Sequence, residues 1–258
     1  MIKFFRKIRQ KLLSENKFSK YLLYAIGEII LVVIGILLAL QINNWNQQRI
    51  EDKKEIELLI DLKDEFAFNL GALEESISIN DKVNQSCKQL TQIIRADSLA
   101  QKSDLVDELL IAIGNFYSFD ARIGVSSEIV NSDKLSILKN EDLRRQLSNW
   151  LTIIVDAEED ILFRSDNYTI NLMPFLMKRF PLANGELTKD LPVDQKNRLE
   201  TYNEKSPFKF DLPQEELMEF ENQIWHHKHN QDYVYINELN LKDFILTTIN
   251  MIEKELNR

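Results

Sequence analysis

The side chains best suited to bind a metal ion stand in one short run, Trp225-His-His-Lys-His, which contains all three histidines of the chain. His226 and His229 are three residues apart, so on a helix they would share a face and could both bind a divalent cation. The spacing supplies no third ligand, and neither H-E-x-x-H nor C-x-x-C occurs in the sequence. We therefore expect a polar helix surface without bound metal, and His226 and His229 are the residues that would hold one.

Patterns for other chemistry are missing from the sequence. Any Ser-His-Asp arrangement would have to use the same histidine run, and no G-x-S-x-G elbow is present to supply the nucleophile. The 6 glycines are scattered singly, so there is no phosphate-binding loop. One predicted helix contains an acidic cluster, which is expected to be solvated surface: Asp156, Glu158, Glu159 and Asp160. A pair of carboxylates alone does not make a glycosidase. The sequence assigns no catalytic residue and no cofactor, and it favours a protein that is not an enzyme.

Residues 21–42, YLLYAIGEIILVVIGILLALQI, are long and apolar enough to cross a membrane. As a helix the segment would measure roughly 33 Å, and a hydrocarbon core is about 30 Å thick. Its Leu, Ile and Val residues each favour insertion by about 0.3 to 0.6 kcal/mol, whereas the single acid, Glu28, opposes it by about 2.5 to 3.5 kcal/mol. An uncleaved anchor is predicted. A cleaved signal peptide is the alternative, but its apolar region usually has only about 7 to 15 residues, and no clear A-x-A site precedes the polar segment.

The distribution of charge predicts the orientation of this anchor. Residues 1–20 carry seven Lys or Arg and one acid, whereas residues 43–54 mix both signs. The N-terminus is therefore expected in the cytoplasm, where residues 1–20 form a basic segment with an amphipathic pattern that suits an anionic leaflet. Removing residues 1–20 from the totals of 32 basic and 41 acidic side chains leaves 25 and 40. An acidic outer domain is a poor nucleic-acid binder, so no such partner is expected.

Several residues of the anchor could contact partners within the membrane. Glu28 would face a protein partner, or it would lie shallow enough to reach headgroup water, and the sequence leaves both readings open. Gly35 and Ala39 form a small-xxx-small pair that permits close approach of a second helix. Three aromatic residues suit the two membrane interfaces: Tyr21, Tyr24 and Trp45.

The remaining residues, 43–258, predict an all-α domain outside the cytoplasm. All 5 prolines fall within residues 174–213, which favours long helices before and after that window. A helix is predicted over residues 49–95. Its apolar face would contain Leu59, Phe66, Leu70, Leu73 and Ile77. Its solvated face would contain the acids Glu55, Glu57, Asp61, Asp64 and Glu65. Further helices are predicted over residues 105–119 and from an N-cap at Asn140 to Pro174, with an irregular stretch between them.

The C-terminal part of the chain is expected to begin with a long connection. Residues 174–213 would form this connection, with a short helix over residues 195–202. Asp211 would cap the next helix, which buries Leu217, Phe220 and Ile224, and a last helix would cover residues 235–256. Cys87 is the single cysteine, which excludes an intrachain disulfide. A buried or idle thiol is predicted, and an intermolecular disulfide is the alternative.

Two stretches of the sequence resemble a known family. The first 46 residues, MIKFFRKIRQKLLSENKFSKYLLYAIGEIILVVIGILLALQINNWN, resemble the opening of a family of bacterial membrane proteins found in Bacteroidota, the domain of unknown function 6090. Residues 134–150, KLSILKNEDLRRQLSNW, resemble the start of that family's middle helix. The resemblance implies a cell-envelope protein with one N-terminal anchor in the inner membrane and a helical domain in the periplasm. It implies no catalytic residues.

The leading hypothesis is a membrane-anchored interaction or scaffold module. Its partners would be the lipid bilayer and, through the membrane helix, a second copy of the chain or another membrane protein. One alternative is a metal-binding or enzymatic domain that uses His226 and His229. Another is a sensor that binds a small ligand between its helices.

Overall fold

The computed structural model describes residues 18–188, 204–210 and 212–257. These residues form helices and connecting segments with no β-strand among them, which confirms the all-α prediction for this part of the chain. The chain divides into two compact units, residues 1–57 and residues 58–258, and one helix, α2 (Phe18–Arg95), contributes to both.

Unit 1 contains the apolar part of α2. Between Leu22 and Glu51 the described side chains are exposed, apart from those of Ala25 and Glu28, which are half-buried. The most apolar window has a mean hydropathy of 2.6, and none of it is buried by the rest of the chain. Within the described residues, α2 is thus the one helix long and apolar enough to cross a membrane. The two helices predicted over residues 21–42 and 49–95 are parts of this single element.

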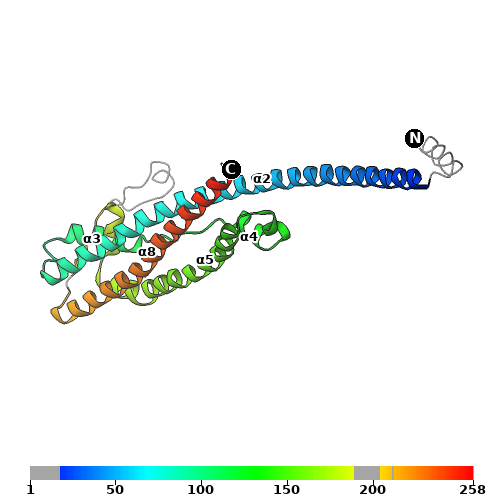
Figure 1. Cartoon of the computed structure of the whole chain (residues 1–258). Coiled ribbons are helices and arrows are strands. Elements are labelled where there is room, and N and C mark those ends of the chain that lie inside the picture. The colour runs from blue at the N-terminus through cyan, green and yellow to red at the C-terminus, as the bar shows by residue number, and fades with distance from the viewer. Residues whose placement is uncertain (1–17, 189–203, 211, 258) are drawn as a thin grey trace. The chain divides into compact units, whose positions relative to one another are not determined.

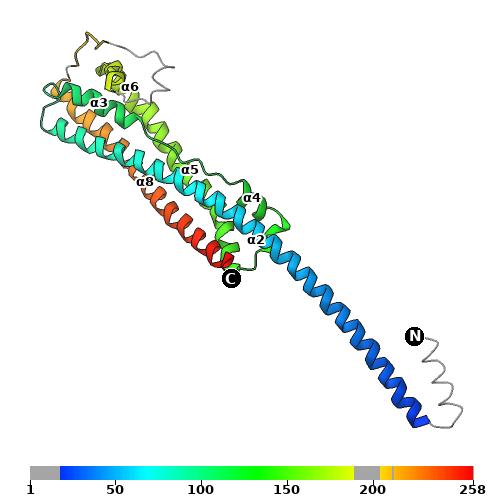
Figure 2. The ribbon, with the colours of Figure 1, turned by 90° about the horizontal axis from the view of Figure 1, so that it is seen from above.

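Three long helices lie side by side in unit 2 (Figure 1, Figure 2): α2 from Leu58 onwards, α5 (Glu141–Asn167) and α8 (Gln214–Leu256). Ion pairs show that α2 and α8 are antiparallel. Lys63 near the start of unit 2 pairs with Glu253 (2.9 Å), and Arg95 at the end of α2 pairs with Glu221 (2.6 Å). The predicted separate helices after residue 211 and over residues 235–256 form one helix, α8, which begins directly after Pro213. Asp211 itself lies outside the described residues.

Between α2 and α5 the structure differs from the prediction. The helix predicted to reach residue 119 is α3 (Ser103–Gly114), and residues 115–123 follow it as an extended segment. Asn80 on α2 pairs with the backbone of Tyr117, and Asn69 on α2 pairs with the backbone of Arg122. These amides take the hydrogen bonds that a longer helix would have made internally. The stretch predicted as irregular contains α4 (Gly124–Val130) and a short 3₁₀ helix, η1 (Asp133–Ile137).

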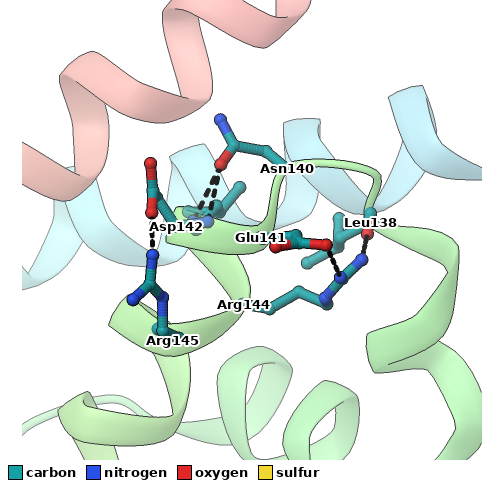
Figure 3. Close-up of polar contacts among 7 residues, drawn as sticks. Leu138, Asn140, Glu141, Asp142, Arg144 and Arg145 are labelled. Carbon is teal, nitrogen blue, oxygen red and sulfur yellow. Dashed lines mark hydrogen bonds and ion pairs between the residues drawn. The ribbon is translucent and has the colours of Figure 1, made fainter.

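The start of α5 confirms the predicted N-cap. The Oδ1 atom of Asn140 accepts hydrogen bonds from the backbone N–H groups of Asp142 (2.9 Å) and Leu143 (3.0 Å) (Figure 3). The guanidinium of Arg144 donates to the carbonyl oxygen of Leu138 (2.6 Å), which attaches the preceding loop to the first turn. Two N–H groups at this terminus, which have no partner within the helix, are thereby satisfied.

Pro174 neither ends nor breaks the helical path after α5. The chain passes from α5 into a π-helical turn, η2 (Tyr168–Leu172), and then into α6 (Met173–Arg179). Pro174 stands in the first turn of α6, where a missing backbone N–H is tolerated. A 3₁₀ segment, η3 (Leu182–Thr188), follows, so the predicted connection begins with helical structure. The short helix predicted over residues 195–202 lies outside the described residues.

The acidic face predicted for α2 is only partly solvated. Glu57, Asp61 and Asp64 are exposed, but Glu55 and Glu65 are buried. The carboxylate of Glu65 accepts hydrogen bonds from the backbone N–H groups of Val125 (2.6 Å) and Ser126 (2.9 Å) in the first turn of α4. A carboxylate at a helix N-terminus satisfies free N–H groups and complements the helix dipole, which explains the burial of Glu65.

Replacing Glu65 by alanine is expected to lower the free energy of unfolding by about 1 to 3 kcal/mol, because the buried N–H group of Ser126 loses its acceptor. Urea denaturation of the full-length protein in mild detergent, followed by circular dichroism, measures this change. Asp64→Ala is the matched control, since Asp64 is the exposed neighbour on the same helix. Equal losses in both variants would contradict the role assigned to Glu65.

Candidate functional site

Unit 2 has two hydrophobic clusters with buried polar side chains between them. One cluster includes Val83 to Ile94 of α2 and Phe220 of α8, and the other includes Leu59 to Leu73 of α2 and Leu241 of α8. Five polar side chains, each no more than 2% exposed, lie between the clusters and form what we call the polar layer: Ser76, Asn80, Arg164, Gln231 and Glu238. The layer joins α2, α5 and α8.

Arg164 is the positive charge of the polar layer. Its guanidinium donates hydrogen bonds to four acceptors: Gln231 Oε1 (2.9 Å), Asn80 Oδ1 (3.4 Å), the carbonyl oxygen of Tyr117 (3.0 Å) and Ser118 Oγ (3.2 Å). It also lies over the ring of Phe116, with 4.5 Å between Cζ and the ring centroid. Burial lowers the pKa of Arg164 to about 10, and the negative charge of Glu238 opposes this shift.

Glu238 is the negative charge of the polar layer. Its carboxylate accepts hydrogen bonds from the hydroxyl of Ser76 (2.5 Å) and from Nδ2 of Asn80 (2.8 and 3.0 Å). Burial raises the pKa of Glu238, while these hydrogen bonds and the charge of Arg164 lower it. The two opposite charges are therefore held apart but share Asn80, which donates to Glu238 and accepts from Arg164.

His227 is fully buried next to the polar layer. Its Nε2–H donates to the carbonyl oxygen of Ile113 (2.9 Å), and the rings of Phe116 and Tyr168 lie 5.8 and 5.3 Å from the imidazole. Burial lowers the pKa of His227 to about 4, against the effect of the hydrogen bond to Ile113, and the charge of Arg164 lowers it further. Neutral His227 is thus the form that fits this site.

Sequence reasoning missed the polar layer, although a signal for it exists. Apart from Asn230, the buried residues of α8 follow one another at alternating steps of four and three, and this spacing continues through polar positions: Phe220, Ile224, His227, Gln231, Val234, Glu238, Leu241, Ile245, Thr248 and Ile252. Periodicity alone therefore places His227, Gln231 and Glu238 on the buried face. Reading only apolar residues hides this continuity.

The predicted metal candidates lie elsewhere on α8. His226 is half-buried and His229 is exposed, and both line a groove of about 330 Å³ between α5 and α8, which we call the α5–α8 groove. Its other lining residues are Asp160, Phe163, Asn230 and Tyr233. Trp225 stacks on His229 with 5.1 Å between ring centroids. In the described part of the chain, no three His, Cys, Asp or Glu residues are placed to hold a metal ion. The groove instead presents flat rings to solvent.

The residues singled out in the anchor lie on α2 in unit 1. Gly35, Ala39 and Trp45 are exposed, and apart from the adjoining backbone of α2 no atom lies within 4 Å of a Cβ added at Gly35. A second helix could therefore approach closely at this point. Glu28 is half-buried. The side chains of Tyr21 and Tyr24 lie outside the described part.

Cys87 carries no chemistry in this fold. The thiol is free and fully buried, as predicted, and burial raises its pKa to about 12. The reactive thiolate is therefore not formed at neutral pH.

A cavity of about 390 Å³ adjoins the polar layer. It lies between α5, α8 and the extended segment, and most of its surface is apolar. Its walls include Ile154, Ala157, Ile161, Val234 and Leu241, and its polar residues are Ser118, Asp120, Glu158, Asn237 and Glu238. Ser118 and Glu238 also contact the polar layer, so the cavity ends against the buried charges. Such a site suits a small apolar molecule with a few polar groups.

Comparison with known proteins adds one match. Residues 28–155 match the model of a family of unknown function, DUF6090. This confirms the resemblance seen in the sequence, from Glu28 through most of α5. No curated protein and no solved structure matches the chain.

Proposed function

We propose that this chain, which carries the DUF6090 family region over residues 28–155, is a membrane-anchored interaction or scaffold module of the cell envelope. The observation that carries the proposal is the apolar segment of α2. No residue in the most apolar window of this segment is buried by the rest of the chain. Burying such a surface in lipid is strongly favourable, while exposing it to water is not. The excess of Lys and Arg in residues 1–20 supports a cytoplasmic N-terminus and a periplasmic unit 2 at the inner membrane.

Two surfaces support a role in protein interaction. In the anchor, Gly35 and Ala39 leave room for a second helix, and Glu28 offers it a polar contact. In unit 2, the α5–α8 groove is bordered by exposed aromatic side chains: Phe163 (61%), Trp225 (58%) and Tyr233 (52%). Aromatic residues are enriched at protein interfaces, because they bury a large area with few rotatable bonds.

Crosslinking in cells with a membrane-impermeant, lysine-reactive reagent tests topology and interaction together. After purification in mild detergent, we expect modified lysines only beyond the apolar segment, from Lys53 onwards and including Lys63 and Lys88. We also expect one specific partner, either a second copy or another membrane protein. Glu28→Gln is expected to reduce recovery of this partner about threefold or more, since a polar contact between membrane helices contributes about 0.6 to 2 kcal/mol.

The matched control is Glu51→Gln, which removes an exposed carboxylate of the same helix beyond the apolar segment and should leave partner recovery unchanged. An unaccompanied monomer in all three proteins would contradict the interaction proposal. Modification confined to the lysines of residues 1–20 would contradict the proposed orientation.

A further inference from the structure

Independently of the membrane proposal, we propose that the cavity between α5, α8 and residues 118–123 binds a small organic cation with an apolar body. The proposal rests on three properties of the cavity: its size, its apolar walls and the sign of the charges in those walls. Each of them restricts the class of ligand.

The size and the walls indicate an apolar body. The cavity has a volume of about 390 Å³, which lies within the range of ligand pockets of about 300 to 1,000 Å³. Aliphatic side chains from both helices form the walls: Ile154, Ala157, Ile161 and Leu162 from α5, with Val234 and Leu241 from α8.

The charges indicate a cationic group. Asp120, Glu158 and Glu238 are the charged residues of the wall, and no Lys or Arg is among its residues. Arg164 donates a hydrogen bond to Ser118 in the wall, and both of its terminal nitrogens are occupied by hydrogen bonds within the protein. Arg122 belongs to the segment that forms the wall but is not a lining residue, and its guanidinium lies over the ring of Phe68, 3.6 Å from the ring centroid. A ligand anion would meet three carboxylates without a counter-charge, whereas an ammonium group would be attracted by all three.

Glu238 distinguishes this cavity from an ordinary acidic surface. It is 2% exposed, and its hydrogen bonds from Ser76 and Asn80 fix the carboxylate at the cavity wall. Burial raises the pKa of Glu238. A cation beside the carboxylate would favour its ionised form, so Glu238 would release a proton on binding whenever it was protonated before. A bare metal ion fits less well, since in the described part of the chain no three His, Cys, Asp or Glu residues are placed to hold one.

Calorimetric titration of the full-length protein in mild detergent tests the proposal with three probes of similar shape: 4-phenylbutylammonium, 4-phenylbutan-1-ol and 4-phenylbutyrate. We expect one ammonium ion bound per chain, at least about tenfold more tightly than the alcohol, and no detectable binding of the carboxylate. About tenfold corresponds to about 1.4 kcal/mol. Ala157→Phe places a ring in the cavity and should weaken ammonium binding at least about tenfold, which also separates specific binding from partition into detergent.

Two single variants, Glu158→Gln and Glu159→Gln, test the role of the negative charge, because each removes one carboxylate from neighbouring positions of α5. Both side chains are exposed, but only Glu158 lines the cavity, so only the first substitution should weaken ammonium binding. Three outcomes would overturn the proposal: equal affinity for ammonium and alcohol, undiminished affinity in a folded Ala157→Phe variant, or no binding of the ammonium ion at millimolar concentration. None of these outcomes bears on the membrane proposal, which the crosslinking experiment tests separately.

Discussion

Replacing Arg164 by methionine is expected to lower the free energy of unfolding by about 3 to 5 kcal/mol, because the substitution leaves Glu238 buried without an opposite charge. Four acceptors also lose their donor, among them Gln231 Oε1 and Ser118 Oγ. Urea denaturation of the full-length protein at neutral pH, followed by circular dichroism, measures the loss.

Two further variants identify its cause. Arg145→Met removes an arginine whose side chain is 76% exposed and pairs with Asp142 on the surface of α5, and it should change stability by less than about 1 kcal/mol. Arg164→Met combined with Glu238→Gln removes both buried charges, and it should be more stable than Arg164→Met alone. If Arg164→Met and Arg145→Met cost the same, the polar layer does not stabilise the bundle as we infer.

Lowering the pH from 6.5 to about 4 is expected to reduce stability through His227 by about 3 kcal/mol. The unfolded chain binds a proton at this histidine near pH 6.5, whereas the folded chain does so only near pH 4, because burial lowers the pKa of His227. The unfolded state therefore holds more protons in this window, and the contribution to stability is complete above pH 6.5. At about 1.4 kcal/mol per pH unit, the window gives the expected loss.

His227→Gln isolates this effect, since glutamine does not titrate and retains an N–H donor for the carbonyl oxygen of Ile113. We expect the stability difference between the parent protein and His227→Gln to shrink by about 3 kcal/mol as the pH falls from 6.5 to 4. Glu238 acts in the opposite direction, because its pKa is higher in the folded chain than in the unfolded chain. Its contribution to stability therefore falls as the pH rises above the pKa of the unfolded chain. This contribution is the same in the parent protein and in His227→Gln. His229→Gln, at an exposed histidine, should behave as the parent. Parallel stability curves for the parent and His227→Gln would contradict the assignment.

The polar layer has a further consequence for the register of the bundle. Glu238 and Gln231 of α8 find their partners on α2, at Ser76 and Asn80, and a shift of α8 by one turn would leave them buried without partners. Apolar side chains tolerate such a shift more easily, because their contacts are not directional. The layer thus specifies how α2 and α8 pair.

What the sequence determined by itself is mostly local or repetitive. The helical apolar segment of α2, the N-cap at Asn140 and the buried face of α8 that contains Phe220 and Ile224 were all correctly predicted. Each depends on residues within one or two helical turns, and a repeated pattern strengthens the signal. The matched family confirms the resemblance over residues 28–155 without adding a biochemical role.

Only the tertiary structure decided where the polar residues lie. Glu65 looked like part of a solvated face, yet it is buried because the N-terminus of α4, 60 residues further along the chain, supplies its hydrogen-bond donors. Arg164 and Glu238 are buried for the same reason, since their partners come from separate helices and from the extended segment after α3. Burial of a polar group depends on partners that compensate for lost water, and a linear pattern does not contain them. The cavity likewise exists only where α5, α8 and residues 118–123 meet, because empty space is a property of packing and not of any one segment.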